Sequence, residues 1–483
     1  MMTITELQQR YAAHPNVEAM SGLLKNPSVR TLFCGGLCAS AASLFSSVLV
    51  QRGEFPFVFI LGDLEEAGYF YHDLTQVLGT DKVLFFPSSF RRAIKYGQKD
   101  AANEILRTEV LSRLQKGEEG ICVVTYPDAL AEKVVSRKEL GDKTLKLHSG
   151  ENVDTNFIME VLRSYGFEYV DYVYEPGQYA VRGSIIDVFS FSSEFPYRID
   201  FFGDEVESIR TFEVETQLSK EKKDSIVIVP DLSRSLEQGG ASGMVSFLDF
   251  LSADTVLAMR DLLWLRERIQ TVHDETLTPQ AIAAREAEES GCITLDGKLI
   301  DGSEFTLRAL DFRRMEFGNK PTGTPDATIT FDTSAQPIFR KNFDMVAESF
   351  KEYMEKGYAL YICSDSMKQT DRIRAIFEDR GDQIAFTAVE RTLHEGFADN
   401  ALRLCIFTDH QLFDRFHKYN LKSDKARSGK VALSLKELNQ FTPGDYVVHT
   451  DHGVGRFSGL VRIPNGDTTQ EVMKLVYQNE DVV

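Results

Sequence analysis

The stretch TLFCGGLCASAASLFSSVLVQRGEFPFVFIL, residues 31–61, is the most informative part of this chain about its fold. An apolar run, TLFC, leads through a turn of small residues into a segment whose apolar side chains recur at helical spacing. A second apolar run, FVFIL, follows. Short apolar strands joined by helices of this length pair in parallel through right-handed crossovers. The stretch therefore predicts a doubly wound α/β sheet.

The same alternation extends over the first 137 residues. Strands are expected at residues 31–34, 57–61, 83–86 and 121–126, and helices at 39–51, 64–78 and 101–114.

Near residue 138 the pattern changes, because strand-like segments now follow one another without helices between them. YRIDFF, residues 197–202, alternates polar and apolar side chains before a Gly203-Asp204 turn, which is typical of a hairpin with one solvated face. The change predicts an antiparallel α+β insertion into the mostly parallel sheet. Its strands are expected at 169–174, 179–181, 185–189, 197–202 and 205–212.

The chain is long enough for several domains. We expect the sheet domain at 1–137 and 214–333, the insertion at 138–213, a further small α/β domain at 334–420, a polar linker at 421–437, and an incomplete β-barrel at 438–483. Within the second segment of the sheet domain, SIVIVP is expected to be a strand and GMVSFLDFL a helix. No motif indicates a role for residues 334–420.

The composition is that of an ordinary globular protein, with 43% hydrophobic and 26% charged residues among 483. No apolar run approaches the roughly 20 residues that cross a bilayer, and the amino-terminal residues lack the pattern of a secretion signal. Cys122, Cys363 and Cys405 lie in apolar runs, which favours buried thiols in a reducing compartment. These features predict a cytoplasmic protein with no membrane partner.

The net charge of −19 repels a polyphosphate backbone at long range, so the chain is not expected to bind DNA autonomously. Arg91, Arg92, Lys95 and Lys99 form a local basic group. Two interpretations of this group stay open: a weak DNA contact in a helicase-like channel, and a solvated surface, which is the commoner case.

The turn GLCASAAS, residues 36–43, has the spacing of the phosphate loop G-x-x-x-x-G-K-[ST], with Gly36 first and Ser43 last. Ala41 stands where the second glycine belongs and Ala42 where the lysine belongs, so no ammonium compensates a nucleotide phosphate. The expected acidic pair at the end of a later strand is replaced by Arg260 and Asp261. We therefore expect a degenerate phosphate loop without catalytic residues; an ordinary small-residue turn is the alternative.

His449 and His452 are the only candidate metal ligands near the end of the chain. Two histidines three residues apart, with no third ligand nearby, are more often structural than metal-binding. No metal site is predicted.

Two longer motifs resemble a known family. EPGQYAVRGSIIDVFSFSSEFPYRIDFFGDEVESIRTFE, residues 175–213, is similar to the inserted domain that bacterial transcription-repair coupling factors share with the excision-repair protein UvrB. PGDYVVHTDHGVGRFSGLVRI, residues 443–463, resembles the RNA-polymerase-interacting domain of these factors and of CarD-type regulators. The degenerate loop lies where the UvrB-like module of the family also lacks its lysine. The resemblance covers essentially the whole chain, in the family's order.

The resemblance implies partners and contact residues. In the family the inserted domain binds UvrA, and the matching positions here are Arg182, Arg198 and Phe202. Arginines offer planar donors for carboxylates, and an adjacent aromatic ring offers apolar area. Residue type alone leaves another interpretation open, in which Arg198 and Phe202 share one sheet face and Phe202 is half-buried core. Ile463 matches a family contact to the RNA polymerase β subunit.

The resemblance also implies what this chain lacks. Compared with the family it has neither the two motor domains, which use ATP and Mg²⁺, nor the carboxy-terminal domain, so we expect a fragment that needs no cofactor. The leading hypothesis is a non-catalytic recruitment platform that binds UvrA and RNA polymerase and reaches DNA only through the full-length protein. The alternatives are an active UvrB-like, ATP-dependent DNA-repair enzyme and a transcription regulator acting mainly through the terminal barrel.

Overall fold

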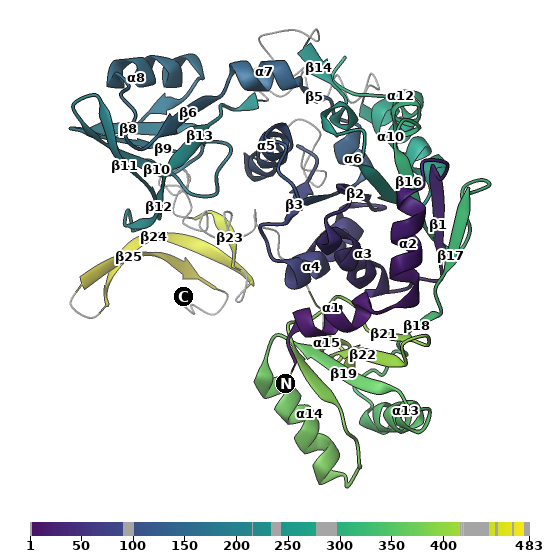
Figure 1. Ribbon diagram of the computed structural model, residues 1–483. Helices are drawn as coiled ribbons and strands as arrows, with labels where there is room; N and C mark the ends of the chain where they lie inside the picture. Colours follow the sequence, from purple (N-terminus) through teal and green to yellow (C-terminus); the bar gives the residue numbers. More distant parts are fainter. Residues whose placement is uncertain are drawn as a thin grey trace. The chain divides into compact units, whose positions relative to one another are not determined.

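The structure is a computed structural model (Figure 1). It describes residues 2–89, 101–214, 216–232, 243–276, 297–415, 417, 419, 444–449, 453–465 and 468–477. The chain forms two compact units, Met1–Ser423 and Asp424–Val483, and each is considered by itself. Among the described residues, no helix combines the length and the apolar character that a membrane crossing requires.

The centre of the first unit is a seven-stranded sheet in which every neighbouring pair is parallel. The expected α/β sheet is thereby confirmed. In spatial order the strands are β17 (Ala327–Thr330), β1 (Thr31–Gly35), β16 (Arg313–Gly318), β15 (Val256–Met259), β2 (Phe57–Ile60), β4 (Cys122–Thr125) and β3 (Val83–Phe86).

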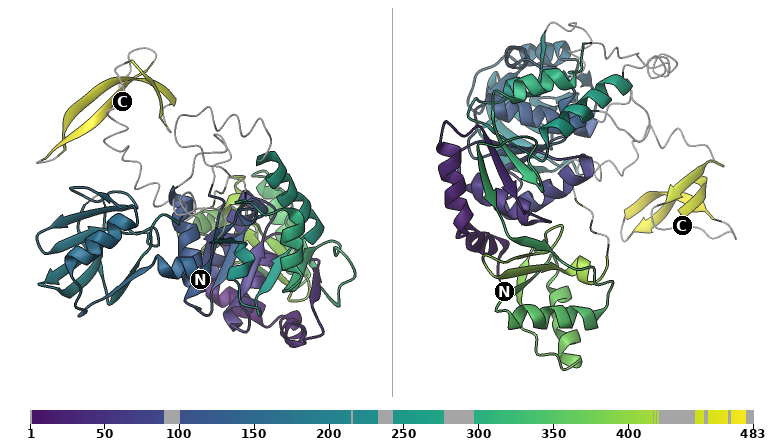
Figure 2. Two further views of the ribbon diagram at one scale, coloured as in Figure 1. Left: turned by 90° about the horizontal axis from the view of Figure 1, so that it is seen from above. Right: turned by 90° about the vertical axis from the view of Figure 1, so that its right-hand side faces the viewer.

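Two groups of helices pack on this sheet (Figures 1 and 2). The first group is α1 (Ile4–Ala12), α2 (Pro15–Lys25), α3 (Ala41–Arg52) and α4 (Leu64–Leu78). The second group is α5 (Ala101–Gln115), α6 (Pro127–Leu130), α10 (Leu262–Thr276) and α12 (Gly302–Ala309). The strand order reverses direction after β3, and right-handed crossovers then require the later helices to cover the opposite face.

Short elements join these layers and correct one expectation. They are α7 (Arg137–Asp142), the pair β5 (Val134–Val135) and β14 (Met244–Val245), and the 3₁₀ turn η2 (Phe247–Phe250). GMVSFLDFL, expected as one helix, thus contains a two-residue strand followed by a 3₁₀ turn. Ser246 separates the two parts, because its hydroxyl caps the turn while its own N–H donates to the Asp249 carboxylate at 3.0 Å in a capping box.

The insertion is built on a six-stranded sheet of order β12–β11–β10–β9–β8–β7. Its strands are β7 (Glu168–Tyr169), β8 (Gln178–Arg182), β9 (Ile185–Val188), β10 (Tyr197–Phe202), β11 (Glu205–Phe212) and β12 (Ser219–Lys223). The helix α8 (Thr155–Ser164) and the antiparallel pair β6 (Leu145–His148) and β13 (Ser225–Ile228) pack with this sheet in one apolar core.

Two expectations about the insertion need correction. SIVIVP does not return to the parallel sheet, because β13 pairs with β6, so the inserted unit extends past the expected end at residue 213. The strand expected at 169–174 ends at Tyr169. The following residues form an irregular segment whose Val173 is buried in a small cluster with Ala180 and Phe212.

The small α/β domain has a mixed sheet of order β18–β21–β22–β19–β20. Its elements are β18 (Thr333–Ala335), α13 (Phe343–Glu355), β19 (Ala359–Ser364), α14 (Met367–Asp379), β20 (Thr387–Glu390), β21 (Phe397–Asp399), β22 (Leu404–Thr408) and α15 (Asp409–Leu412). The amino terminus of the chain joins this sheet, since Met2 makes a parallel bridge to Val389.

The second unit contains an antiparallel sheet of β23 (Tyr446–His449), β24 (Gly453–Asn465) and β25 (Thr468–Val476). The central strand pairs with both neighbours over the described residues. The expected β-rich segment is confirmed in this coarse form, and its assignment as an incomplete barrel stays a prediction.

The chain leaving the small domain returns to helix α4. The Tyr69 hydroxyl donates to the carbonyl of His417 at 2.9 Å, and the rings of Tyr69 and Tyr419 meet edge to face at 5.0 Å between centroids. Gly68 makes this approach possible, because a Cβ atom there would lie 2.4 Å from the Tyr419 ring. The residues just before the expected linker are therefore anchored on α4.

This close approach predicts the effect of Gly68→Ala. Alanine usually favours a helix over glycine by about 0.5–1 kcal/mol, but here the added methyl group must displace the Tyr419 ring. We expect faster limited proteolysis around Tyr419 and little or no gain in melting temperature. Gly22→Ala in α2 is the matched control, since nothing lies within 4 Å of its Cβ position, and it should raise the melting temperature. Equal gains from both substitutions would contradict the proposed packing.

Candidate functional sites

The turn after β1 is closed by contacts with Phe331 and Thr333 of the same chain. Gly36 has φ +83°, and a Cβ atom there would lie 2.0 Å from the Phe331 carbonyl oxygen, so only glycine fits. The Thr333 hydroxyl donates to the Gly36 carbonyl at 2.6 Å and accepts from the Cys38 N–H at 3.1 Å. A backbone donor that a bound phosphate would need is thus already paired within the chain.

The other predicted loop residues, Ala41, Ala42 and Ser43, are the first three residues of α3. The Ser43 hydroxyl donates to the buried carboxylate of Asp73, from α4, at 2.7 Å. The other Asp73 oxygen accepts the N–H of His394, from the small domain, at 2.7 Å. Burial raises the pKa of Asp73 to about 6, so at neutral pH an anion already sits beside the α3 amino terminus.

An 850 Å³ cleft opens at the carboxyl ends of β1, β2, β15 and β16, where open α/β sheets commonly bind ligands. Arg260, one of its basic side chains, pairs with Glu66 at 2.5 Å. Asp261 accepts the N–H of Trp264 at 2.9 Å and so caps α10. The charged side chains that line the cleft are acidic at Asp63, Glu65, Glu66, Asp73, Asp261 and Glu395, and basic at Arg260 and Lys320. This balance opposes a triphosphate.

The acidic cleft predicts the response to nucleotide. We expect ATP with Mg²⁺, at millimolar concentration, to leave the melting temperature of the chain unchanged, because a ligand that does not bind the folded state cannot stabilise it. Thermal shift with and without ATP measures this. A saturable rise in melting temperature, lost on replacing Lys320 with Ala, would show that the cleft binds nucleotide after all.

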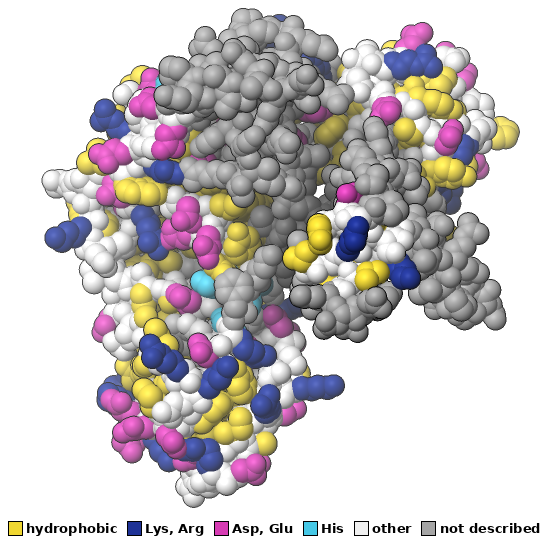
Figure 3. Space-filling view, turned by 180° about the vertical axis from the view of Figure 1, so that it is seen from behind, with side chains coloured by type: hydrophobic (Ala, Val, Ile, Leu, Met, Phe, Trp, Pro, Cys, Tyr) yellow, Lys and Arg dark blue, Asp and Glu magenta, His cyan; other side chains and the backbone are white. Residues whose placement is uncertain are grey.

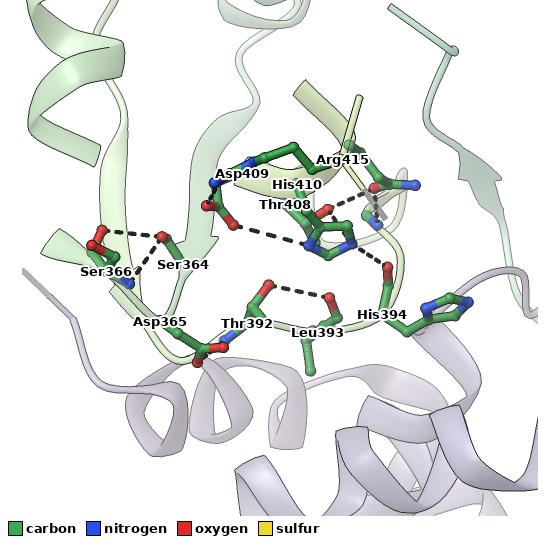
Figure 4. Close-up of polar contacts among 12 residues, drawn as sticks. Ser364, Asp365, Ser366, Thr392, Leu393, His394, Thr408, Asp409, His410 and Arg415 are labelled. Carbon is green, nitrogen blue, oxygen red and sulfur yellow. Dashed lines mark hydrogen bonds and ion pairs between the residues drawn. The ribbon is translucent and has the colours of Figure 1, made fainter. Parts of the chain in front are cut away.

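Histidines gather where the small domain meets α4: His72 and His410 are buried, and His394 and His417 are half-buried. Figure 3 shows histidine side chains close together on this face of the molecule, and Figure 4 shows how His394 and His410 lie. The His410 ring bonds the His394 carbonyl at 2.8 Å and stacks on His417 with centroids 4.4 Å apart. His417 in turn meets His72 of α4 at 4.9 Å, and the His394 ring stacks on Tyr69 at 3.5 Å. Among the described residues, no His, Cys, Asp or Glu group is arranged to hold a metal ion. The ring contacts therefore make the cluster a packing contact between α4 and the small domain.

Burial lowers the pKa of His72, His394 and His410 to about 4 each, and it also lowers that of His417. Neutral rings stabilise the junction fully above the unfolded pKa of about 6.5, and this contribution is lost as the pH falls toward 4. The raised pKa of Asp73 has the opposite effect on stability, because its carboxylate takes up a proton at a higher pH in the folded state than in the unfolded state. This one group is outweighed by the four histidines. The charged groups nearby are Asp365, Glu395, Asp409 and Arg415.

We therefore expect the junction to loosen between about pH 6.5 and pH 4.5. As the pH is lowered over this range, peptides from α4 and residues 392–412 should lose protection against hydrogen exchange, measured relative to the intrinsic exchange rate. Peptides from the core of the parallel sheet should lose less protection. His72→Phe should weaken the effect, because the Nε2 atom of His72 is buried without a partner. His148→Gln changes an exposed histidine on β6 and should leave the pH dependence as it is. Identical pH profiles for all three proteins would exclude the mechanism.

The second candidate site is on the inserted sheet, where one buried carboxylate holds two arginines. Asp187 of β9 is fully buried and accepts two bonds of 2.8 Å from Arg198 of β10 and one bond from Arg182 of β8. Arg198 also donates to the Gln217 carbonyl at 3.0 Å, and its guanidinium lies 4.4 Å from the Phe212 ring centroid. Hydrogen bonding to Asp187 raises the pKa of Arg198 above its ordinary value.

Exposure differs among the three residues expected to bind a partner. The side chain of Arg198 is 15% exposed and that of Arg182 is 36% exposed, whereas Phe202 is 77% exposed. Arg198 and Phe202 do share one sheet face, but Ile199 and Phe201, not Phe202, point to the core. The interpretation of Phe202 as half-buried core is therefore wrong. Arg182 and Phe202 are accessible, and Arg198 is mostly internal.

Several important residues escaped the sequence analysis. Asp73 has no local motif, because its partners come from residues 30 and about 320 positions away. Asp187 could have been found, since a carboxylate at an internal position of the apolar strand IIDV requires a cationic partner. Tyr172 was placed in a strand that ends at Tyr169 in the structure.

Two of the remaining predicted residues lie in strands of the second unit. Ile463 lies in β24 opposite Gln470, and His449 ends β23. His452 and the basic residues Arg91, Arg92, Lys95 and Lys99 lie outside the described residues. The thiols of Cys122, Cys363 and Cys405 are buried and free, as expected.

Comparison with known proteins supports both motifs. The UvrB interaction domain family matches residues 145–233, and the CarD-like/TRCF RID domain family matches residues 441–483. Transcription-repair-coupling factors of Staphylococcus aureus (strain bovine RF122 / ET3-1) and Bacillus subtilis (strain 168) are each 22% identical over 92% of this chain. The chain is related to the transcription-repair-coupling factors. The match to residues 145–233 also includes β13, in agreement with its pairing to β6.

The chain spans less than half of these relatives, since the alignments cover 43% of the length of each. The shared part contains the domain type related to UvrB and the domain type related to CarD.

Proposed function

We propose that this chain is a non-catalytic recruitment platform that links stalled transcription to nucleotide excision repair. It binds UvrA through the inserted domain and RNA polymerase through the carboxy-terminal sheet. The observation that carries the proposal is the outer face of the inserted sheet, where Arg182 and Phe202 are exposed on a domain matched by the UvrB interaction family.

In this proposal the three UvrA-binding residues act differently. Phe202 supplies apolar contact area, and Arg182 supplies guanidinium donors that its single bond to Asp187 leaves available. Arg198, which is mostly internal, contributes chiefly by fixing Asp187 and thereby the position of Arg182.

RNA polymerase binding is supported by the CarD-like/TRCF RID match at residues 441–483. We assign Ile463, on the long central strand β24, to the contact with the polymerase β subunit. ATP and Mg²⁺ belong, in this proposal, to a motor elsewhere in a longer protein, and DNA is reached only through that protein.

The competing function is an active UvrB-like, ATP-dependent DNA-repair enzyme. It requires a phosphate loop with a lysine, but Ala42 occupies that position, the Cys38 N–H is paired with Thr333, and Asp73 places an anion beside the helix. These features favour the recruitment platform.

Arginine substitutions test the UvrA assignment. Arg182→Ala should weaken UvrA binding about tenfold or more, because it removes charge-assisted hydrogen bonds worth about 1.5–3 kcal/mol. Arg198→Ala should weaken binding by a similar factor, because Asp187 and Arg182 are then no longer held in position. Only Arg198→Ala should also lower the melting temperature clearly, because it leaves the buried Asp187 without its two-bond partner. Binding is measured by pull-down and by surface-based affinity titration.

Arg308→Ala is the control for this experiment. Arg308 lies on α12, outside the inserted domain, and pairs with Asp249 and Glu304. Its replacement should leave UvrA affinity unchanged. Wild-type affinity in both folded test variants would refute the assignment of UvrA to this surface.

A further inference from the structure

Tyr172 lies against the exposed arginine of the inserted sheet. The Arg182 guanidinium is 5.0 Å from the centroid of the Tyr172 ring, and the tyrosine is 50% exposed. A cation stacked on an aromatic face in this way is attracted by about 0.5–2 kcal/mol, depending on exposure. The ring therefore restricts Arg182 from one side while Asp187 restricts it from another.

The three exposed side chains, Tyr172, Arg182 and Phe202, belong to the same face. Arg182 and Ala180 alternate with residues that enter the core of the domain, and Val173 packs on Ala180, so the irregular segment carrying Tyr172 crosses this outer face. Side-chain alternation along β10 puts Phe202 on the outer face as well.

They also lie at the same end of that face. Ile185 pairs with Arg182 on one side and with Asp200 on the other, and the N–H of Phe201 donates to the Ser184 carbonyl at 2.9 Å. Phe202 therefore follows directly beside the turn that begins after Arg182. The end of β8, the end of β10 and the segment 170–174 form one small surface.

The charges of this surface indicate its partner. Asp187 accepts from two guanidinium groups, so one carboxylate faces two positive charges. The accessible guanidinium of Arg182 has aromatic neighbours that supply apolar area. A carboxylate bordered by apolar side chains on another protein would complement this arrangement.

We propose that Tyr172 is a contact residue of this surface and that it receives, together with Arg182 and Phe202, an acidic, apolar-bordered patch of UvrA. The inference rests on the proposed function and adds a residue outside the matched arginine and phenylalanine positions. Tyr172 holds the Arg182 guanidinium in place and buries its own ring against the partner.

The test uses the full chain and purified UvrA. Tyr172→Ala should weaken binding about tenfold, in line with the loss of a buried interface aromatic, whereas Tyr172→Phe keeps the ring and should bind within about twofold of wild type. Phe157→Ala is the matched control, because Phe157 is a 53% exposed aromatic on α8, the helix that packs on the other face of the sheet.

A second measurement protects the test against a folding defect. A photo-reactive benzoylphenylalanine at position 172 should crosslink to UvrA, and the same group at position 157 should not. Combining Tyr172→Ala with Arg182→Ala should cost less affinity than the product of the single effects, since the two side chains act through one contact.

The outcomes separate this inference from the proposed function. The role of Tyr172 is overturned if Arg182→Ala loses UvrA binding while Tyr172→Ala binds fully and position 172 gives no crosslink. UvrA recruitment by this surface would then still stand. Full binding in both single variants overturns both. Equal losses in Tyr172→Ala and Phe157→Ala would show that the binding surface is not this face.

Discussion

The buried carboxylate of Asp73 is the contact on which the arrangement of the first unit depends. It accepts from Ser43 at the start of α3 and from the backbone of His394 in the small domain. The same helix terminus, in a nucleotide-binding protein, would attract the phosphates of a ligand. Here the protein supplies the anion itself, and the anion also ties two domains together. The Asp73 carboxylate therefore connects the start of α3 to the small domain.

Other contacts at the junction follow from this fastening. The Ser40 hydroxyl accepts the N–H of Glu395, next to His394, so two consecutive backbone donors of the small domain bond to α4 and to the loop before α3. The neutral histidine rings and Tyr69 then fill the space between α4 and the small domain. Reopening the loop for a nucleotide would require these contacts to be broken as well as a lysine to be gained.

Local patterns made much of the fold predictable. Buried parallel strands such as Phe57–Ile60 are continuous apolar runs, and α4 and α5 begin and end within a residue of their expected bounds. The failures occurred where a partner distant in sequence decides the outcome. SIVI is as apolar as a parallel strand, but its pairing with residues 145–148 places it in the insertion. The packing of the Tyr419 ring over Gly68 also has no local signal, because the two residues are far apart in sequence; the expected linker at 421–437 itself lies outside the described residues.

The binding residues were predictable by motif but not in their physical roles. Sequence similarity selects Arg182, Arg198 and Phe202 together, whereas only the structure separates the exposed pair from the internal arginine. The separation follows from register, because Arg198 lies directly opposite Asp187 in the β9–β10 pairing while Arg182 is at the end of β8. A single buried carboxylate can neutralise one guanidinium; the second keeps a positive charge that a partner can meet. In a chain of net charge −19, the proposed docking of an acidic partner would depend on this second guanidinium.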